Sequence, residues 1–314
     1  MSFFSITSGK FVRIKEKKFD YERDLQKLVE SNIKELFGLD FIRGSLNSEF
    51  HIKGTHQDLY FDTLAFDPQT MAFVILEYKK DRNISVIDQG YTYLSTLINN
   101  KAEFILEYEE QKNLKLKRTD VDWNQTRVIF ISREFTPYQK GAIGFKDVPF
   151  ELWEAQLFEN GFCSFMQIKT AETQESISKF TKSPTVKKVT EEVKTFTFED
   201  HNNKASAPTR ALLDDLRKKI FDLDEQVKEK PVQNYIGYKI NWFNFVTVHV
   251  YRDKLKAYVR MEKLENDPKK RFTKVPVSYN WGKTPLWWLD ISNSADVNYM
   301  MAAIEESYKK APDR

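Results

Sequence analysis

Three charged side chains, Asp62, Glu77 and Lys79, have a spacing that could support chemistry. They lie in the stretch FDTLAFDPQTMAFVILEYKK, residues 61–80, where an apolar run ends abruptly in Glu-Tyr-Lys-Lys. Side chains alternate between the two faces of a strand, so Glu77 and Lys79 are expected to point the same way. A carboxylate and an ammonium are therefore predicted to share one face at the end of an otherwise buried strand.

A hairpin would bring the second acid to this pair. Residues 59–66 and 72–79 read as strands, and the loop Asp67-Pro68-Gln69-Thr70 between them has the composition of a tight connection. Asp62 and Glu77 are nearly symmetric about the centre of that loop. We therefore expect antiparallel pairing to place Asp62 beside Glu77 at one edge of a sheet.

Two carboxylates at one point suit a hard divalent cation, Mg²⁺ or Mn²⁺, for which Asp62 and Glu77 are the candidate ligands. A cation held there would activate water and offset the charge of a phosphodiester, and Lys79 would add a positive charge beside it. The alternative for these three residues is a surface cluster of ion pairs at exposed strand ends.

The elements around these residues predict a mixed α/β layer with a central sheet. A helix is expected within residues 19–38, where leucines recur at helical spacing before Gly38. Residues 48–53 add a further strand before the hairpin, residues 85–100 read as a helix, and residues 128–132 read as a buried strand. Residues 104–108 are expected to form a short strand, and residues 150–155 another.

The pattern D-(x)14-E-x-K resembles the core of the PD-(D/E)xK nuclease superfamily, although Phe61 stands where the family's name has proline. Gln89 and Tyr93, as Gln-x-x-x-Tyr, resemble the additional motif of its RecB-like members, and at i, i+4 they share one helix face. The resemblance implies a restriction-endonuclease-like mixed sheet flanked by helices. It also implies catalytic roles for Asp62, Glu77, Lys79 and Gln89.

The resemblance implies a further acid on the preceding helix. Glu22 and Glu30 are both candidates, and we prefer Glu22 for its position at the helix start. The alternative for Glu22 is a carboxylate that only stabilises the helix start through the helix dipole. Tyr93, Lys80 and Arg82 are candidates for substrate contact, with DNA as the expected partner. The basic run at residues 13–18 could add phosphate contacts, and a small hairpin is expected just before it, from Phe3 to Ile14.

The chain has 314 residues, a net charge of +3 and a single cysteine, Cys163. The charge alone does not argue for nucleic acid. One cysteine excludes an intrachain disulfide, and no stretch reaches the ~18 apolar residues of a membrane span, so we expect a cytoplasmic protein.

We expect a nuclease-like domain at residues 1–168, a linker at 169–208 with a short strand at 195–198, and a C-terminal α+β domain at 209–314. The last should open with a helix from Thr209 to about Glu229. The chain resembles a bacterial two-domain family of unassigned role, often catalogued as "predicted transport protein", whose C-terminal domain is uncharacterised. That domain is expected to recognise substrate or a protein partner.

The favoured function is therefore a Mg²⁺-dependent DNA nuclease. One alternative is a non-catalytic module that binds nucleic acid or protein and retains the nuclease fold. The other is a structural role in a larger membrane-associated or defence complex.

Overall fold

The computed structural model describes residues 3–19, 21–53, 58–79, 86–145, 147–169, 175–179, 181–276 and 285–312. Contacts group the chain into two units. The N-terminal unit contains residues 1–34, 39–67 and 72–193, and the C-terminal unit contains residues 35–38, 68–71 and 194–314. The division falls inside the stretch that we expected to be a linker.

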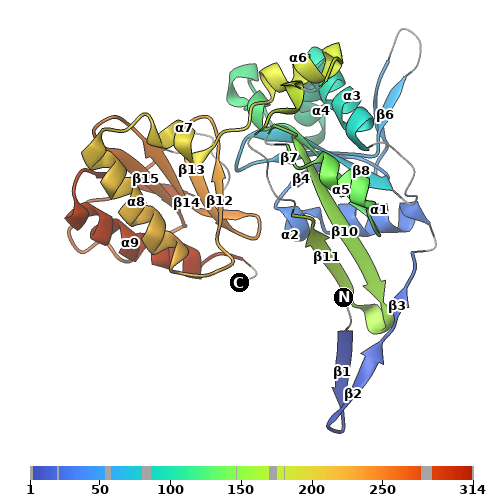
Figure 1. Cartoon of the computed structure of the whole chain (residues 1–314), viewed down its shortest axis with the longest axis horizontal. Helices are drawn as coiled ribbons and strands as arrows, with labels where there is room; N and C mark the ends of the chain where they lie inside the picture. The colour runs from blue at the N-terminus through green and yellow to red at the C-terminus, as the bar shows by residue number, and fades with distance from the viewer. Residues whose placement is uncertain are drawn as a thin grey trace. The chain divides into compact units, whose positions relative to one another are not determined.

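A mixed sheet forms the centre of the N-terminal unit, with strand order β11-β10-β9-β8-β7-β4 and β3 paired to β10 (Figure 1). Its strands are β3 (Glu16–Lys17), β4 (Asp40–Arg43), β7 (Thr63–Asp67), β8 (Ala72–Lys79), β9 (Arg127–Ser132), β10 (Phe150–Phe158) and β11 (Cys163–Gln167). Strands β8, β9 and β10 are parallel, and the remaining pairs are antiparallel. This order confirms the predicted fold class, a mixed α/β layer built around one sheet.

Helices cover both faces of this sheet. The helices of this unit are α1 (Glu22–Ser31), α3 (Val86–Asn99), α4 (Lys101–Lys112), α5 (Pro137–Ala142) and α6 (Pro184–Glu192), and α2 (Ile33–Phe37) has residues in both units. Tyr78 of β8 lies within hydrogen-bond distance of Thr63, whose hydroxyl donates a hydrogen bond to Glu30 of α1. On the other face of the same strand, the Phe73 ring contacts Phe104 of α4, and Glu77 accepts a hydrogen bond from Gln89 of α3. Because side chains of opposite parity point to opposite faces, α1 and the α3–α4 pair lie on opposite sides of β8.

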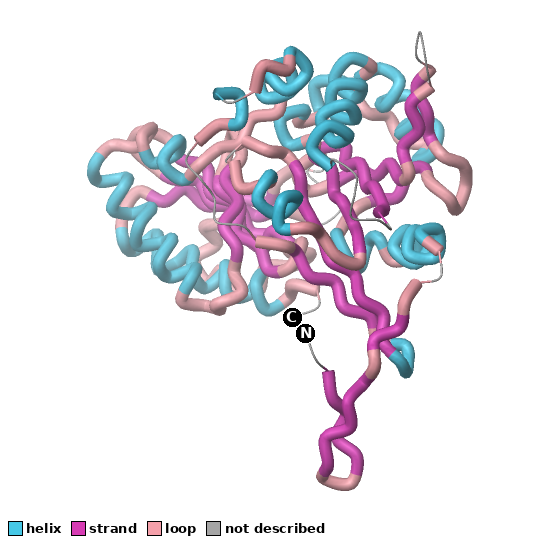
Figure 2. Tube along the Cα trace, turned by 45° about the vertical axis from the view of Figure 1, so that its right-hand side comes forward, coloured by secondary structure: helices cyan, strands magenta, loops and turns pink. Residues whose placement is uncertain are grey.

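Two hairpins stand outside this sheet. Strands β1 (Phe3–Thr7) and β2 (Lys10–Ile14) form one two-stranded ribbon, as predicted, and β5 (Phe50–Ile52) and β6 (Leu59–Phe61) form the other. In Figure 2 the β1–β2 ribbon projects from the end of the unit at which β10 meets β3.

Four sequence expectations on secondary structure are corrected. Residues 104–108 belong to helix α4, because Phe104 and Tyr108, both buried, are one helical turn apart. The helix expected within residues 19–38 is interrupted at Asn32, and the strand expected at 59–66 breaks at Asp62. The stretch at 195–198 forms no strand, since a capping box at Thr197 begins helix α7 (Phe198–Asn202) there.

The C-terminal unit has an antiparallel sheet with strand order β12-β13-β14-β15-β17-β16. The strands are β12 (Lys228–Pro231), β13 (Ile236–Ile240), β14 (Phe243–Val250), β15 (Leu255–Arg260), β16 (Thr273–Lys274) and β17 (Leu286–Ile291). Helices α8 (Ala207–Phe221) and α9 (Ser294–Lys309) contact each other and the sheet, so they cover one face. Helix α8 ends at Phe221, eight residues before the end that we predicted at about Glu229. Glu229 itself lies in β12, which begins at Lys228.

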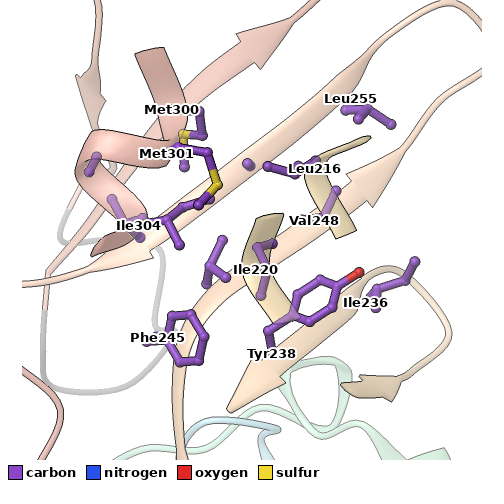
Figure 3. Close-up of a cluster of buried hydrophobic side chains, with 14 of the residues drawn as sticks. Leu216, Ile220, Ile236, Tyr238, Phe245, Val248, Leu255, Met300, Met301 and Ile304 are labelled. Atoms are coloured by element: carbon purple, nitrogen blue, oxygen red, sulfur yellow. The ribbon is translucent and has the colours of Figure 1, made fainter. Parts of the chain in front are cut away.

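Apolar side chains from both helices and the sheet fill the space between them. Figure 3 shows Leu216 and Ile220 of α8 and Ile304 of α9 over Val248 and Leu255 of the strands, all buried. The C-terminal part of the chain is therefore an α+β unit with its own core, as predicted.

Candidate active site

The hairpin β7–β8 carries the candidate site, and its register places Asp62 opposite Glu77. Thr63 pairs with Leu76 and Asp67 with Ala72, so the next position outward joins residues 62 and 77. Asp62 itself is the bend between β6 and β7. The bend turns its carboxyl group toward β8, where Oδ2 accepts a hydrogen bond of 3.0 Å from the Tyr78 amide. The hairpin predicted from the sequence is thus present.

Glu77 is the centre of the site. Its side chain is buried, and Oε1 accepts hydrogen bonds of 2.6 Å from Lys79 Nζ and from Gln89 Nε2. The first bond confirms that Glu77 and Lys79 share a strand face. The second joins β8 to helix α3, the helix that the sequence predicted at residues 85–100.

Two oxygen atoms at this point are buried without a hydrogen-bond donor among the described residues. They are Oε2 of Glu77 and Oε1 of Gln89. Buried acceptors in folded proteins almost always have a partner, so each unsatisfied one needs an explanation. A cation bound by both oxygens would satisfy them, and so would a water molecule that donates a hydrogen bond to each.

Asp62 is electrostatically unusual. Burial, followed by the negative charge of Glu77, raises the pKa of Asp62 to about 7, against the lowering effects of the Tyr78 amide and of Lys79. Two carboxyl groups that repel each other in a poorly hydrated place favour a shared proton or a bound cation. Strongly shifted pKa values of this kind gather at functional sites.

Gln89 also fixes Tyr93, one turn further along α3. Gln89 Nε2 donates a hydrogen bond of 2.7 Å to the Tyr93 hydroxyl, and the buried ring lies 5.1 Å from that of Phe61. Burial, followed by the charge of Glu77, raises the pKa of Tyr93. The hydroxyl therefore stays protonated and holds the Gln89 amide toward Glu77.

The helix acid is where the structure departs most from our preference. Glu22 is exposed in the first turn of α1, whereas Glu30, two turns on, is buried. Glu30 Oε1 accepts hydrogen bonds from Gln26 Nε2 (2.9 Å), the Ser45 amide (3.0 Å) and Thr63 Oγ1 (2.6 Å). Its other oxygen, Oε2, accepts a bond of 2.6 Å from Ser45 Oγ.

Glu30 supports the strand that carries Asp62. Thr63 binds Glu30 directly, and Gln26 donates both to Glu30 and, at 2.8 Å, to the Asp62 carbonyl. Gly44 permits this approach, since a Cβ there would lie 2.1 Å from Glu30 Oε1. Glu30 is thus bonded to Thr63 and, through Gln26, linked to the backbone of the bend at Asp62.

Sequence reasoning missed Gln26, Ser45, Thr63 and Tyr78. A signal existed for Gln26 and Glu30, which are spaced i, i+4 beside the buried Leu25 and Val29. Polar side chains on the buried face of an amphipathic helix require partners. No comparable pattern marks Ser45 or Thr63.

The residues present fit a divalent cation as a pair of oxygen ligands. Within the described ranges, no group of three or more His, Cys, Asp or Glu side chains is arranged to hold a metal. Mg²⁺, however, is commonly bound by one or two carboxylates and keeps several waters. Asp62 and Glu77 supply that number, with one unsatisfied oxygen on Glu77. Lys80 and Arg82, the candidate substrate contacts, lie outside the described residues.

Comparison with known proteins identifies the C-terminal part of the chain. Residues 198–311 match the model of a domain of unknown function, DUF5655, so the accessory domain that the resemblance implied is present. An uncharacterized protein of Haemophilus influenzae is 34% identical over 311 residues, which are 98% of this chain and 100% of that protein.

A solved structure, "Structure of EndoMS in apo form", also matches, over 42% of this chain and 44% of that chain. The sequence identity is 16% and the TM-score is 0.25, too low to support an argument. Among the described residues, no helix is long and apolar enough to cross a membrane.

Proposed function

The chain belongs to the family of the Haemophilus influenzae protein, and we propose that it is a Mg²⁺-dependent nuclease that hydrolyses phosphodiester bonds in DNA. The observation that carries the proposal is the close pair of the half-buried Asp62 and the buried Glu77, with Lys79 bonded beside it and an oxygen of Glu77 that lacks a hydrogen-bond partner among the described residues. We assign the N-terminal unit to the PD-(D/E)xK nucleases, RecB-like in its Gln89–Tyr93 motif. With the separate β5–β6 hairpin left aside, the helices α1 and α2, the strands β4, β7 and β8, the helices α3 and α4 and the strand β9 follow one another, and this helix–three strands–helix–strand order supports the assignment.

Asp62 and Glu77 are the proposed ligands of Mg²⁺ or Mn²⁺. Such a cation lowers the pKa of a water molecule and offsets the charge of the phosphate. Lys79, held 2.6 Å from Glu77, adds a positive charge at the same end of β8 and is placed to orient the attacking water or the phosphate. Gln89 and Tyr93 hold Glu77 in place, and Glu30, rather than Glu22, holds the bend at Asp62.

We further propose that residues 209–314 recognise substrate or a partner, that residues 1–168 form the nuclease domain and residues 169–208 join the two, and that the protein works in the cytoplasm. Lys80 and Arg82 stay candidate substrate contacts.

The test is cleavage of labelled duplex DNA, single-stranded DNA and RNA with Mg²⁺, Mn²⁺ or EDTA. The matched variants are Asp62→Asn, Glu77→Gln and Lys79→Ala, with Glu305→Gln, an exposed acid of α9, as the control. Loss of a group that activates or positions the reacting water typically costs on the order of 10²–10⁴ in rate. We expect losses of that size in the three site variants and wild-type rates in the control.

Manganese binding provides a readout independent of turnover. Electron paramagnetic resonance should detect Mn²⁺ bound to the wild-type protein and much weaker binding by Asp62→Asn and Glu77→Gln. Cleavage that survives all three site substitutions would overturn the proposal. Metal binding without cleavage of any substrate would favour a binding module that retains the fold.

A further inference from the structure

The ribbon β1–β2 carries a strongly apolar surface that is exposed among the described residues. Phe4 pairs with Arg13 and Ile6 with Phe11 across the two strands, so these four side chains share one face. Phe4, Ile6 and Phe11 are 51%, 74% and 78% exposed. We call this surface the ribbon face. Three large apolar side chains exposed together usually mark a binding surface.

The same ribbon and the segment after it are basic. Residues 10–18 contain five cations, Lys10, Arg13, Lys15, Lys17 and Lys18, and one acid, Glu16. All five cations are exposed, and none forms an ion pair with the described residues. The single acid is already paired, since Glu16 accepts from Arg133 Nε at 2.9 Å. The ribbon therefore presents apolar side chains together with unpaired positive charge.

The base of the ribbon is fixed to the end of β10. The Phe3 ring lies 4.8 Å from that of Phe158, the Glu159 amide donates to the Lys15 carbonyl at 2.9 Å, and β3 pairs with the last residues of β10. A two-stranded ribbon on its own is only marginally stable in water. This anchorage sets the direction of the ribbon, while its tip extends beyond the sheet (Figures 1 and 2).

This anchorage is at the same end of the sheet as the candidate active site. Strands β8, β9 and β10 run parallel, and Lys79, Ser132 and Glu154 are aligned across them. Beyond Glu154, β10 continues to Phe158, roughly 13 Å further at the strand rise. Strands β8 and β10 are two strand spacings, roughly 10 Å, apart. A duplex lying across Lys79 therefore reaches the base of the ribbon within one helical turn, roughly 34 Å.

We propose that the β1–β2 ribbon is a DNA-binding arm that enters a groove of the duplex beside the site of cleavage. Lys10 and Arg13 contact phosphates on either side of the groove, and the ribbon face packs against sugars and base edges. Grooves of B-form DNA accept a two-stranded ribbon, and proteins that insert apolar side chains into DNA combine them with basic residues in this way.

Charge decides between DNA and a second copy of the chain as the occupant. Two arms packed face to face would bring the Arg13 side chains of both ribbon faces together, and residues 10–18 of each copy carry four further cations near them. Like charges at an interface oppose association, whereas phosphates complement them. This proposal rests on the proposed function for the identity of the substrate, but the arm can be tested without cleavage.

The experiment measures binding of a fluorescent 30-base-pair duplex to the full-length chain in EDTA, by anisotropy across a series of salt concentrations. The arm variant is Lys10→Ala with Arg13→Ala. Its matched control, Lys117→Ala with Arg118→Ala, removes one lysine and one arginine from the exposed segment before β9, at the opposite end of the sheet. Each phosphate contact contributes about 0.9 to the slope of log K against log salt.

We expect the arm variant to lose up to about 1.8 of that slope and to bind roughly 10- to 60-fold more weakly at 0.1 M salt. Phe11→Ser should weaken binding with the slope unchanged, because it removes an apolar contact rather than a phosphate contact. The control should bind as the wild type does. Circular dichroism and thermal unfolding of each variant verify that it is folded.

Three outcomes separate the arm from the nuclease proposal. Binding by the wild type that the arm variant lowers, without cleavage in Mg²⁺, supports the arm and counts against the nuclease. Cleavage by the wild type with equal DNA binding in the arm and control variants overturns the arm alone. Self-association in sedimentation equilibrium that Phe11→Ser abolishes, with DNA binding intact, shows that the arm joins copies of the chain and also overturns the proposal.

Discussion

Two aspartates, the half-buried Asp62 in one unit and the buried Asp296 in the other, show how differently the molecule uses a carboxyl group. Burial opposes ionisation of Asp296 in the C-terminal unit, but hydrogen bonds from the Ser292 amide and Arg271 outweigh it and lower its pKa. Burial and Glu77 raise the pKa of Asp62 in the N-terminal unit to about 7. Asp296 holds the start of α9 together, whereas Asp62 faces a second acid, Glu77, with a buried oxygen that has no hydrogen-bond partner in the part of the chain that the structure describes.

The comparison distinguishes structural from functional burial. A buried polar group with complete hydrogen bonding stabilises a fold, and Ser307 in the C-terminal core, bonded to the carbonyls of Phe245 and Arg260, is another example. A buried like-charge pair costs stability, so its persistence points to a task that needs it. The proposed function assigns Asp62 and Glu77 to the second kind.

The largest expected effect is the difference between Asp62→Asn and Asp296→Asn. At pH 8, Asp62→Asn should raise the free energy of unfolding and Asp296→Asn should lower it, each by about 1–2 kcal/mol, which makes a difference of about 2–4 kcal/mol. Urea unfolding, with hydrogen exchange resolved on peptides of each unit, measures both.

The pH dependence of the two variants gives a sharper test. The pKa of Asp62 is higher in the folded than in the unfolded chain. Ionisation of Asp62 therefore does not lower the free energy of unfolding below about pH 4, lowers it increasingly up to about pH 7, and lowers it by a constant amount above that. The gain from Asp62→Asn should follow that curve. The pKa of Asp296 is lowered, so its contribution is present at neutral pH and lost in acid. If Asp62→Asn and Asp296→Asn changed the free energy of unfolding in the same direction at pH 8, the contrast between the two aspartates would be wrong.

The next effect concerns the helix acid. Glu30→Gln should destabilise the N-terminal unit by about 2 kcal/mol, because a neutral amide cannot accept all the hydrogen bonds that Gln26, Ser45 and Thr63 now donate. Glu22→Gln, an exposed change in the same helix, should stay within about 0.5 kcal/mol. Thermal unfolding of the two variants measures the difference. A larger loss of stability in Glu22→Gln than in Glu30→Gln would show that Glu22, our first preference, is the helix acid with the structural contacts.

Glu22 and Glu30 also mark the boundary of what the sequence could predict. Strand parity and the symmetry of the hairpin predicted the pairing of Asp62 with Glu77 and the shared face of Glu77 and Lys79, because both follow from the period of a strand. The choice between two acids of one helix depends on the direction in which that helix packs. That direction is set by distant residues such as Ser45, which no local pattern reveals.

Helix α4 shows a second kind of limit. Phe104 and Tyr108 suggested a strand by their composition, although their spacing of four residues is also that of a helix face. Both side chains are buried against the sheet, and Phe104 contacts Phe73 and Phe61. In a short apolar run the two-residue repeat of a strand and the 3.6-residue repeat of a helix cannot be told apart. The surface on which the run packs then determines which of the two forms.

The smallest expected effect is a pH dependence of the C-terminal unit with the opposite sign to that of Asp62. Burial, followed by the charges of His201 and Lys256, lowers the pKa of His249 to about 4, and the rings of Tyr235 and Tyr258 enclose it. The unfolded chain takes up a proton below about pH 6.5, but the folded unit does not. The C-terminal unit should therefore lose about 1–2 kcal/mol between pH 6.5 and pH 5.

The variant His249→Gln should reduce this slope, and what is left belongs to the buried His201, whose pKa is also lowered by burial. His51→Gln, at an exposed position in β5, should leave it unchanged. Hydrogen exchange on residues 243–260 at the two pH values measures the effect where it arises. A C-terminal unit that gains stability in acid would show that His249 is charged when folded, and the opposition between the two units would then be lost.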